Sequence, residues 1–176
     1  MKKVFLLLLA FSFVAVSVNA QNGTMKVEPS VVIATSQTGT GMGFGANGTF
    51  FYGINNNIDL TASLGYITWS YDGWDGSLST VPVLFGGRYS FGEQSGFTPY
   101  VSAELGLHFM SFSYEIPGIA GWTEAQTYSE STSEFGIGLG GGAYYNIGST
   151  TLDANVQYNS MNGSFFSVEV GAIFAL

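Results

Sequence analysis

Two glycine-rich stretches have the spacing of a dinucleotide-binding loop. The G-x-G-x-x-G pattern is matched twice, by Gly136, Gly138 and Gly141 and by Gly43, Gly45 and Gly48. Such a loop binds a pyrophosphate only between a strand and a helix, because backbone N–H groups and the helix N-terminus hold the phosphates. Neither stretch leads into a segment with helical periodicity. We therefore expect no nucleotide and no other cofactor, and the glycines need a different explanation.

Acid–base or nucleophilic chemistry would have to use very few side chains. The chain has no cysteine, and His108 is its only histidine. A serine nucleophile needs a base such as histidine beside it. The strand pattern described below places His108 on the same face as Glu104, which favours a histidine bonded to a carboxylate over a catalytic base. We therefore assign no catalytic residue and no metal ligand, and we expect the protein not to be an enzyme.

The first residues have the build of a secretory signal peptide. Two lysines precede an apolar run from Val4 to Val16, and small residues up to Ala20 form a cleavage site. A membrane anchor is the alternative, but it would need about 20 consecutive apolar residues. We therefore expect a signal peptide at residues 1–20 and a single domain at residues 21–176.

The charge balance of that domain excludes nucleic acid as a partner. Lys26 and Arg88 are its only basic residues, against twelve acidic ones. Binding nucleic acid phosphates requires Lys and Arg. Charged residues make up only 9% of the chain, yet no long apolar run follows the first segment. A chain of this kind suits a membrane if strands, and not helices, cross it.

Apolar and polar residues alternate along most of the chain, which is the period of a strand with two different faces. In residues 58–69, for example, Leu60 and Leu64 lie on one face, whereas Thr61 and Ser63 lie on the other. The alternation predicts eight strands, at residues 27–34, 41–52, 58–69, 79–91, 100–109, 134–145, 152–158 and 167–176. The first is the weakest, because its proline suits only an edge or the start of a strand.

The predicted connections alternate in length. The second, fourth and sixth, INNN, GEQSG and NIGS, are short, whereas YDGWDGS and EIPGIAGWTEAQ are longer. Bacterial outer-membrane barrels have short periplasmic turns and longer external loops. The pattern therefore predicts an all-β fold: a closed, eight-stranded, antiparallel, up-and-down transmembrane β-barrel in the outer membrane of a Gram-negative bacterium.

The two faces of the strands differ in a way that decides which one contacts lipid. The polar face consists mostly of small residues with a few acids, which suits a narrow lumen and explains the glycines. The apolar face, with Phe85, Leu105, Leu139 and Val170, is expected to contact outer-membrane lipid. Aromatic residues mark its ends, as interfacial girdles do. They include Tyr52, Tyr66, Tyr89, Phe91, Tyr145 and Phe174.

Two neighbouring segments resemble a known family. VPVLFGGRYSFG, at residues 81–92, and FTPYVSAELGLHF, at residues 97–109, look like the central hairpin of small outer-membrane β-barrels. This family includes the OmpA transmembrane domain and OmpX, and the match is closest to the Bacteroidetes-type outer membrane protein beta-barrel domain. The chain departs from the usual terminal aromatic residue, since Leu176 is last and Phe174 stands two before it. The resemblance implies a fold and a location, and it does not fix a molecular activity.

Three functions fit such a barrel. We favour a structural or surface-interaction role, in which a monomer with a filled lumen contacts a surface ligand or protein through exposed loops. A lipid A-modifying enzyme is an alternative that His108 alone supports poorly. A narrow diffusion channel is another, although side chains nearly fill the interior of eight strands. The candidate loop contacts are Asp72, Trp74, Asp75 and Trp122.

Charged residues on the inward face predict a cluster in the lumen. With the last turn centred near Met161, Asp153 and Glu169 become direct cross-strand neighbours. Two carboxylates so placed repel each other unless a cation or a shared proton lies between them. Arg88, the only arginine, also faces inward. We therefore predict a lumen charge cluster in which Arg88 reaches Asp153, Glu169 or Glu104.

A second contact is predicted on the same inward face. If the longest connection is centred near Gly121, His108 lies opposite Glu134 on the neighbouring strand. We therefore expect these two residues to form a hydrogen-bonded pair in the lumen.

Overall fold

The computed structural model describes residues 23–35, 40–71, 76–92, 96–116, 126–148, 150–161 and 163–176. The expected signal peptide at residues 1–20 lies outside the described residues. Eight strands follow one another along the chain: β1 (Met25–Ala34), β2 (Thr40–Gly53), β3 (Ile58–Tyr71), β4 (Gly76–Ser90), β5 (Phe97–Ile116), β6 (Gln126–Ile147), β7 (Thr150–Ser160) and β8 (Phe165–Ala175).

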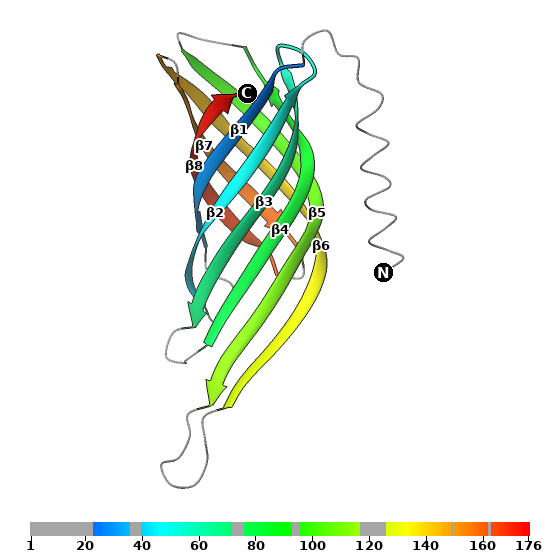
Figure 1. Ribbon diagram of the computed structural model, residues 1–176, viewed down its shortest axis with the longest axis vertical. Helices are drawn as coiled ribbons and strands as arrows, with labels where there is room; N and C mark the ends of the chain where they lie inside the picture. The colour runs from blue at the N-terminus through cyan, green and yellow to red at the C-terminus, as the bar shows by residue number, and fades with distance from the viewer. Residues whose placement is uncertain are drawn as a thin grey trace.

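The strands form a closed antiparallel barrel in which each pairs with its neighbours in sequence (Figure 1). The first strand closes the sheet by pairing with the last, so that Val31 of β1 lies opposite Val170 of β8. Closure leaves no open sheet edge along the shared height of the strands, which is what lipid requires of a spanning sheet. The predicted eight-stranded up-and-down barrel is confirmed. Among the described residues, no helix is long and apolar enough to cross a membrane.

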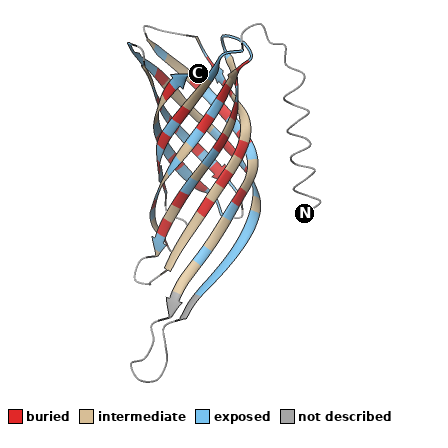
Figure 2. Ribbon diagram, viewed as in Figure 1, coloured by how far each residue is buried: buried red, intermediate tan, exposed pale blue. Residues whose placement is uncertain are grey.

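Burial follows the predicted alternation along each strand (Figure 2). Leu105 is 54% exposed on the outer wall, as are Leu139 and Val170 to similar extents, whereas Glu104 beside Leu105 is buried in the lumen. Phe85 is half-buried and lies on the same outer face, opposite Leu105 in the register of β4 and β5. The polar face therefore points inward and the apolar face outward.

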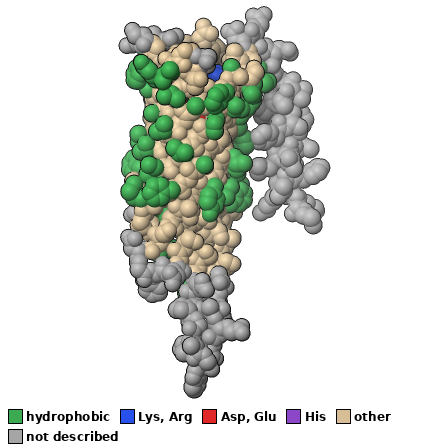
Figure 3. Space-filling model, turned by 60° about the vertical axis from the view of Figure 1, so that its left-hand side comes forward, with side chains coloured by type: hydrophobic (Ala, Val, Ile, Leu, Met, Phe, Trp, Pro, Cys, Tyr) green, Lys and Arg blue, Asp and Glu red, His purple; other side chains and the backbone are tan. Residues whose placement is uncertain are grey.

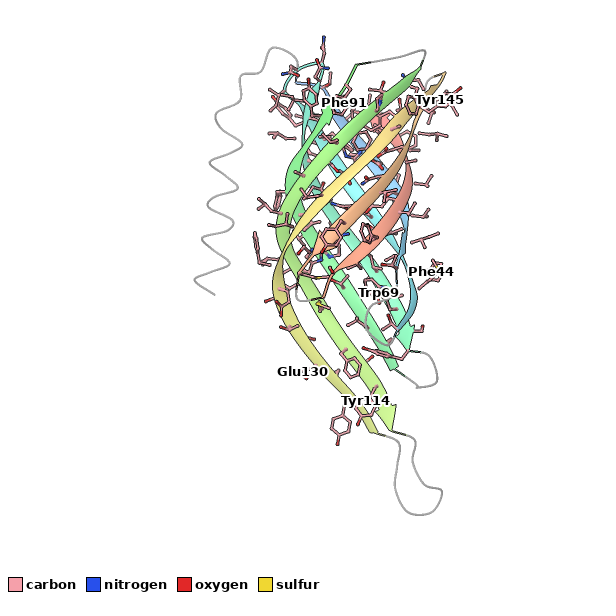
Figure 4. All side chains as sticks on the ribbon, turned by 180° about the vertical axis from the view of Figure 1, so that it is seen from behind. Phe44, Trp69, Phe91, Tyr114, Glu130 and Tyr145 are labelled. Carbon is pink, nitrogen blue, oxygen red and sulfur yellow. The ribbon has the colours of Figure 1, made fainter. Side chains whose placement is uncertain are left out.

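Two girdles of exposed aromatic residues mark the ends of the apolar wall. We call the end that holds the start of β1 and the end of β8 the terminal end, and the opposite one the hairpin end. The terminal girdle contains Tyr89, Phe91, Phe97, Tyr145 and Phe174. The hairpin-end girdle contains Phe44, Tyr66, Phe109, Phe135, Tyr158 and Phe166. Figure 3 shows hydrophobic side chains gathered at two levels of the barrel and scattered on the wall between them, and Figure 4 labels Phe91 and Tyr145 at one level and Phe44 at the other.

The hairpin formed by β5 and β6 is longer than the sequence predicted. These strands have 20 and 22 residues, whereas the alternation predicted strands only at residues 100–109 and 134–145. Beyond Phe109 the outward positions of β5 carry Ser111 and Ser113, whereas Phe112 and Tyr114 lie on the inward face. The outward face is therefore no longer apolar where the hairpin leaves the apolar wall. In Figure 1 this hairpin projects well beyond the other strands.

Replacing a lipid-facing residue by arginine should destabilise the barrel. Leu105→Arg places a charge on the apolar wall and should lower the free energy of unfolding by about 2–4 kcal/mol if the residue lies near the bilayer midplane. Urea titration in lipid vesicles measures the change. Ser131→Arg, on the projecting part of β6, is the control and should have little effect. Equal effects of the two substitutions would show that the wall has been assigned wrongly.

Candidate functional site

Arg88 of β4 lies inside the lumen near the terminal end. Its side chain is only 3% exposed, and Nη1 donates hydrogen bonds to Asp153 Oδ2 of β7 at 2.6 Å and to Glu28 Oε2 of β1 at 3.3 Å. The guanidinium thus joins strands that are not neighbours in the sheet. Because a buried charge is unfavourable unless it is paired, the cation and its carboxylates stabilise one another. The structure therefore brings together Arg88 and Asp153 of the predicted cluster.

Aromatic rings surround the guanidinium of Arg88. Its Cζ lies 4.6 Å from the ring centre of Tyr100 and 4.8 Å from that of Phe51. Tyr144 stacks on Tyr100 with ring centres 4.6 Å apart, and its hydroxyl accepts a hydrogen bond from Arg88 Nη1 at 3.3 Å. The Tyr100 hydroxyl donates to Asp153 Oδ1 at 2.8 Å. We call this set of side chains the arginine layer: Glu28, Phe51, Arg88, Tyr100, Tyr144 and Asp153.

Glu28 belongs to this layer, but it was not among the residues predicted for the lumen cluster. The signal was present in the sequence, because apolar Val31 and Ile33 alternate with Ser30, and the same alternation carried back places Glu28 on the face of Ser30. The structure buries both Glu28 and Ser30. Pro29 obscured this signal. The proline points outward and lies where the pairing of β1 with β8 is interrupted, between Val27 and Ser30, so it does not break the alternation.

The other two members of the predicted cluster do not contact Arg88. Glu104 accepts hydrogen bonds from Thr61 Oγ1 at 3.0 Å and from Gln157 Nε2 at 3.1 Å. Glu169 accepts one from Asn47 Nδ2 at 3.3 Å. Both carboxylates are buried in the lumen on the hairpin side of the arginine layer.

The predicted cross-strand pairing of Asp153 with Glu169 is wrong. In the register of β7 and β8, Asp153 lies opposite Gly171, and Glu169 lies opposite Asn155. The turn is centred one residue later than Met161, which moves each partner by two residues. A shift of two preserves the face of every side chain, so both acids remain inward but at different heights in the barrel.

His108 and Glu134 lie opposite each other in the register of β5 and β6, as predicted. However, no hydrogen bond or ion pair joins them, and neither ring nitrogen of the buried His108 has a partner among the described residues. The imidazole lies instead over Gly136, where the position of an added Cβ would be 2.8 Å from Nε2. The expected pair is therefore wrong, because this glycine leaves space into which the ring turns.

The glycines of β6 provide space for side chains from both neighbouring strands. At Gly138 an added Cβ would collide with Gln157 Nε2 of β7. At Gly140 it would lie 2.6 Å from Ser102 Oγ of β5 and 3.0 Å from Asn155 Oδ1 of β7. We call these inward positions the glycine groove: Gly136, Gly138, Gly140 and Gly142. Both G-x-G-x-x-G matches lie inside strands, β6 and β2, and have no nucleotide-binding geometry.

An apolar plug fills the lumen at the hairpin end. Trp69 is 0% exposed, meets Phe165 edge-to-face with ring centres 5.3 Å apart, and donates from Nε1 to the Thr35 carbonyl oxygen at 3.0 Å. The plug consists of Val32, Ala34, Ile67, Trp69 and Phe165, with Leu78 and Met161 packed against it. The alternation in the sequence predicted a lumen of small polar residues and did not indicate this apolar group.

The loop contact candidates Asp72, Trp74, Asp75 and Trp122 lie outside the described residues. Within the described part of the chain, no group of three or more His, Cys, Asp or Glu side chains is arranged to hold a metal ion.

The projecting part of β6 has one free edge. β7 pairs with β6 only from Ile137 onward, where Ile137 lies opposite Ser160. From Ser129 to Phe135, β6 pairs with β5 on one side, and no described strand pairs with it on the other. Tyr114 and Glu130, labelled in Figure 4, lie on this projecting sheet.

Comparison with known proteins identifies the family. The model of the outer membrane protein beta-barrel domain matches residues 4–174. The chain belongs to this family. Membership supports a location in the outer membrane of a Gram-negative bacterium. A search of curated proteins gave no significant match.

Solved structures with the same fold include three bacterial surface or outer-membrane proteins. Ail, the attachment invasion locus protein of Yersinia pestis, has a TM-score of 0.60 and 17% identity, covering 89% of this chain and 100% of that one. Neisserial surface protein A has a TM-score of 0.56 and 20% identity, covering 85% and 94%. A major outer membrane protein of Thermus thermophilus has a TM-score of 0.65 and 14% identity, covering 89% and 100%. At these identities the likeness concerns the fold alone.

Removing the central cation should destabilise the barrel strongly. Arg88→Met leaves Glu28 and Asp153 buried without their partner, which should cost about 3–5 kcal/mol in the free energy of unfolding. Lys26→Met is the matched control. Lys26 pairs with Asp59 at 3.3 Å but is partly exposed at the terminal rim, so its loss should cost about 0–1 kcal/mol. Urea unfolding that gives equal, small changes for both variants would contradict the role of the arginine layer.

The glycine groove can be tested with two adjacent residues of β6. In Gly142→Ala the new methyl group would collide with the Ala154 carbonyl oxygen and lie 2.6 Å from the Tyr100 hydroxyl oxygen. Such overpacking should cost about 1–3 kcal/mol. In Gly141→Ala the methyl group points outward and meets only the Tyr100 carbonyl oxygen at 3.4 Å, so stability should change little. If both variants unfold at the same urea concentration, the groove is not tightly packed.

Proposed function

We propose that this protein is a closed outer-membrane barrel that acts at the cell surface, where the free edge of β6 binds an extended segment of a partner protein. The observation that carries the proposal is the projecting hairpin, whose edge from Ser129 to Phe135 pairs with no described strand. Exposed edges of this kind accept a further strand through main-chain hydrogen bonds. The short turns at the terminal end and the long hairpin at the other support an orientation with the hairpin outside the cell.

The contents of the lumen support a surface role over a channel. The arginine layer occupies the cross-section near the terminal end, and the apolar plug occupies it near the hairpin end. Between them lies a cavity of about 20 Å³, roughly enough for one water molecule. Both closures would have to rearrange before solutes could pass.

The charge of the hairpin favours a particular class of partner. Residues 97–148 contain no Lys or Arg, and Glu130 is exposed on the free edge. Ail has been solved in complex with sucrose octasulfate, a heparin analogue, and binding such a polyanion needs basic residues. The hairpin of this chain lacks them, so the partner segment we propose is neutral or basic polypeptide and not a sulfated sugar.

An enzymatic role has less support. His108 is buried beneath the apolar plug, and neither of its nitrogens contacts a hydroxyl group among the described residues. A base for hydrolysis or acyl transfer has to lie within hydrogen-bond reach of its nucleophile.

The closed sheet supports a monomer. Because β1 pairs with β8, the barrel closes without a strand from a second copy of the chain.

Edge binding is tested with the barrel in lipid nanodiscs and a displayed library of random peptides. Along β6, successive N–H groups point alternately toward β5 and toward the free edge. Proline has no N–H, so we compare Ser131→Pro with Thr132→Pro. One of these variants removes a donor from the free edge, and the other removes a hydrogen bond between β5 and β6. We expect selected peptides to bind the parent barrel and to lose binding when the free-edge donor is removed.

Leu105→Ala, on the lipid-facing wall, is a control that should leave peptide binding unchanged. Peptides that bind the edge-blocked variant as well as the parent would contradict strand addition. In planar bilayers the parent should give no steady conductance, and a reproducible large conductance would favour the channel instead.

A further inference from the structure

The small cavity inside the barrel has two carboxylates in its wall. Glu104 of β5 and Glu169 of β8 both line it, between the arginine layer and the apolar plug. Each is at least nine-tenths buried. Buried carboxylates are normally paired with a cation, bound to a metal or protonated, because an isolated charge away from water is very unfavourable.

No cationic side chain of the described residues pairs with either carboxylate. Arg88 contacts Glu28 and Asp153, and Lys26 contacts Asp59. The sequence contains no other Lys or Arg beyond position 3. Hydrogen bonds from neutral groups, such as that from Gln157 to Glu104, only partly offset the burial of two negative charges.

An amide oxygen without a hydrogen-bond donor lies beside Glu169. Asn47 lines the same cavity and donates from Nδ2 to Glu169, yet its own Oδ1 accepts no hydrogen bond from the described residues. Asn155 lies opposite Glu169 on β7, but it is not among the residues that line the cavity, and its Oδ1 lies over Gly140 of the glycine groove. The unsatisfied amide group in the cavity wall is therefore an oxygen acceptor, which lacks a positive charge or a donor.

His108 gives a second indication that the cavity binds a ligand. Its side chain is 1% exposed, lines the same cavity, and has no hydrogen-bond partner at Nδ1 or Nε2 among the described residues. A buried imidazole without partners is unusual, because buried polar groups are nearly always hydrogen-bonded. The cavity wall therefore contains a buried polar side chain whose partner the described residues do not supply.

We infer that the lumen binds one hard divalent cation between Glu104 and Glu169, with Asn47 Oδ1 as a further ligand. Carboxylate and amide oxygens are the ligands that such ions prefer, and two carboxylates balance two positive charges. Calcium is favoured over magnesium. Magnesium retains several waters and needs regular octahedral geometry, whereas a cavity of about 20 Å³ has room for a single largely dehydrated ion.

The site lies between two closed layers, so the ion would enter during folding. The test uses the protein purified from outer membranes, unfolded in urea with EDTA, and refolded with calcium, magnesium or sodium at equal ionic strength. Elemental analysis after gel filtration counts the bound metal, and urea titration measures stability. We expect about one calcium per barrel and a higher urea midpoint with calcium than with magnesium or sodium.

Glu169→Gln removes one charge with little change in shape and should lose both the bound calcium and the shift in midpoint. Glu130→Gln, an exposed acid on the hairpin, is the matched control and should keep both. If Glu169→Gln does not fold, Asn47→Ala takes its place and should retain less calcium than the parent. A parent barrel that retains no calcium, an equal shift with magnesium, or full retention by the folded variants would overturn the site. A midpoint that rises on acidification but not with calcium would also overturn it, and would assign a shared proton to the two carboxylates.

Discussion

The absence of water in the hydrocarbon layer of a membrane is the constraint on which the rest of this structure depends. Backbone N–H and C=O groups there find partners only within the protein, so a sheet that spans the layer has to close. The pairing of β1 with β8 provides that closure. Closing only eight strands makes the lumen narrow, and the inward face then has room for few large side chains. The glycine groove of β6 and the collisions that an added Cβ would cause there follow from this narrowness.

The narrow lumen is closed at two levels by different chemistry. Near the terminal end, Arg88 holds two carboxylates and lies among aromatic rings. Near the hairpin end, Trp69 and its neighbours form an apolar plug that contains no charge. The polar layer ties distant strands together through directed bonds, whereas the plug stabilises by burying apolar surface. Between the two lie the carboxylates of Glu104 and Glu169, separated from water at both ends.

Because side chains fill the interior, the surfaces free to bind a partner lie on the outside of the barrel. The apolar wall between the girdles suits contact with lipid, and the described strands are joined at the terminal end by short connections. The projecting part of β5 and β6 is the largest described surface that neither lipid nor the lumen accounts for. This projecting sheet differs from the wall of the barrel in its backbone pairing. Its edge from Ser129 to Phe135 pairs with no described strand, whereas the strands of the wall form a closed sheet.

The sequence by itself determined the strand number, the closure and the face of nearly every side chain, because alternation with period two reports local geometry and the solvent on each side. It identified Arg88, Asp153, Glu104 and Glu169 as lumen residues for the same reason. Only the tertiary structure decided which of them meet. Contacts across a barrel depend on the relative height of distant strands, and a turn displaced by one residue separated Asp153 from Glu169 while leaving both inward. Likewise, the inward face of Glu28 follows from the alternation along β1, but its contact with Arg88 across the barrel does not. His108 turned away from Glu134 into space left by Gly136 on the next strand, which no pattern within β5 records.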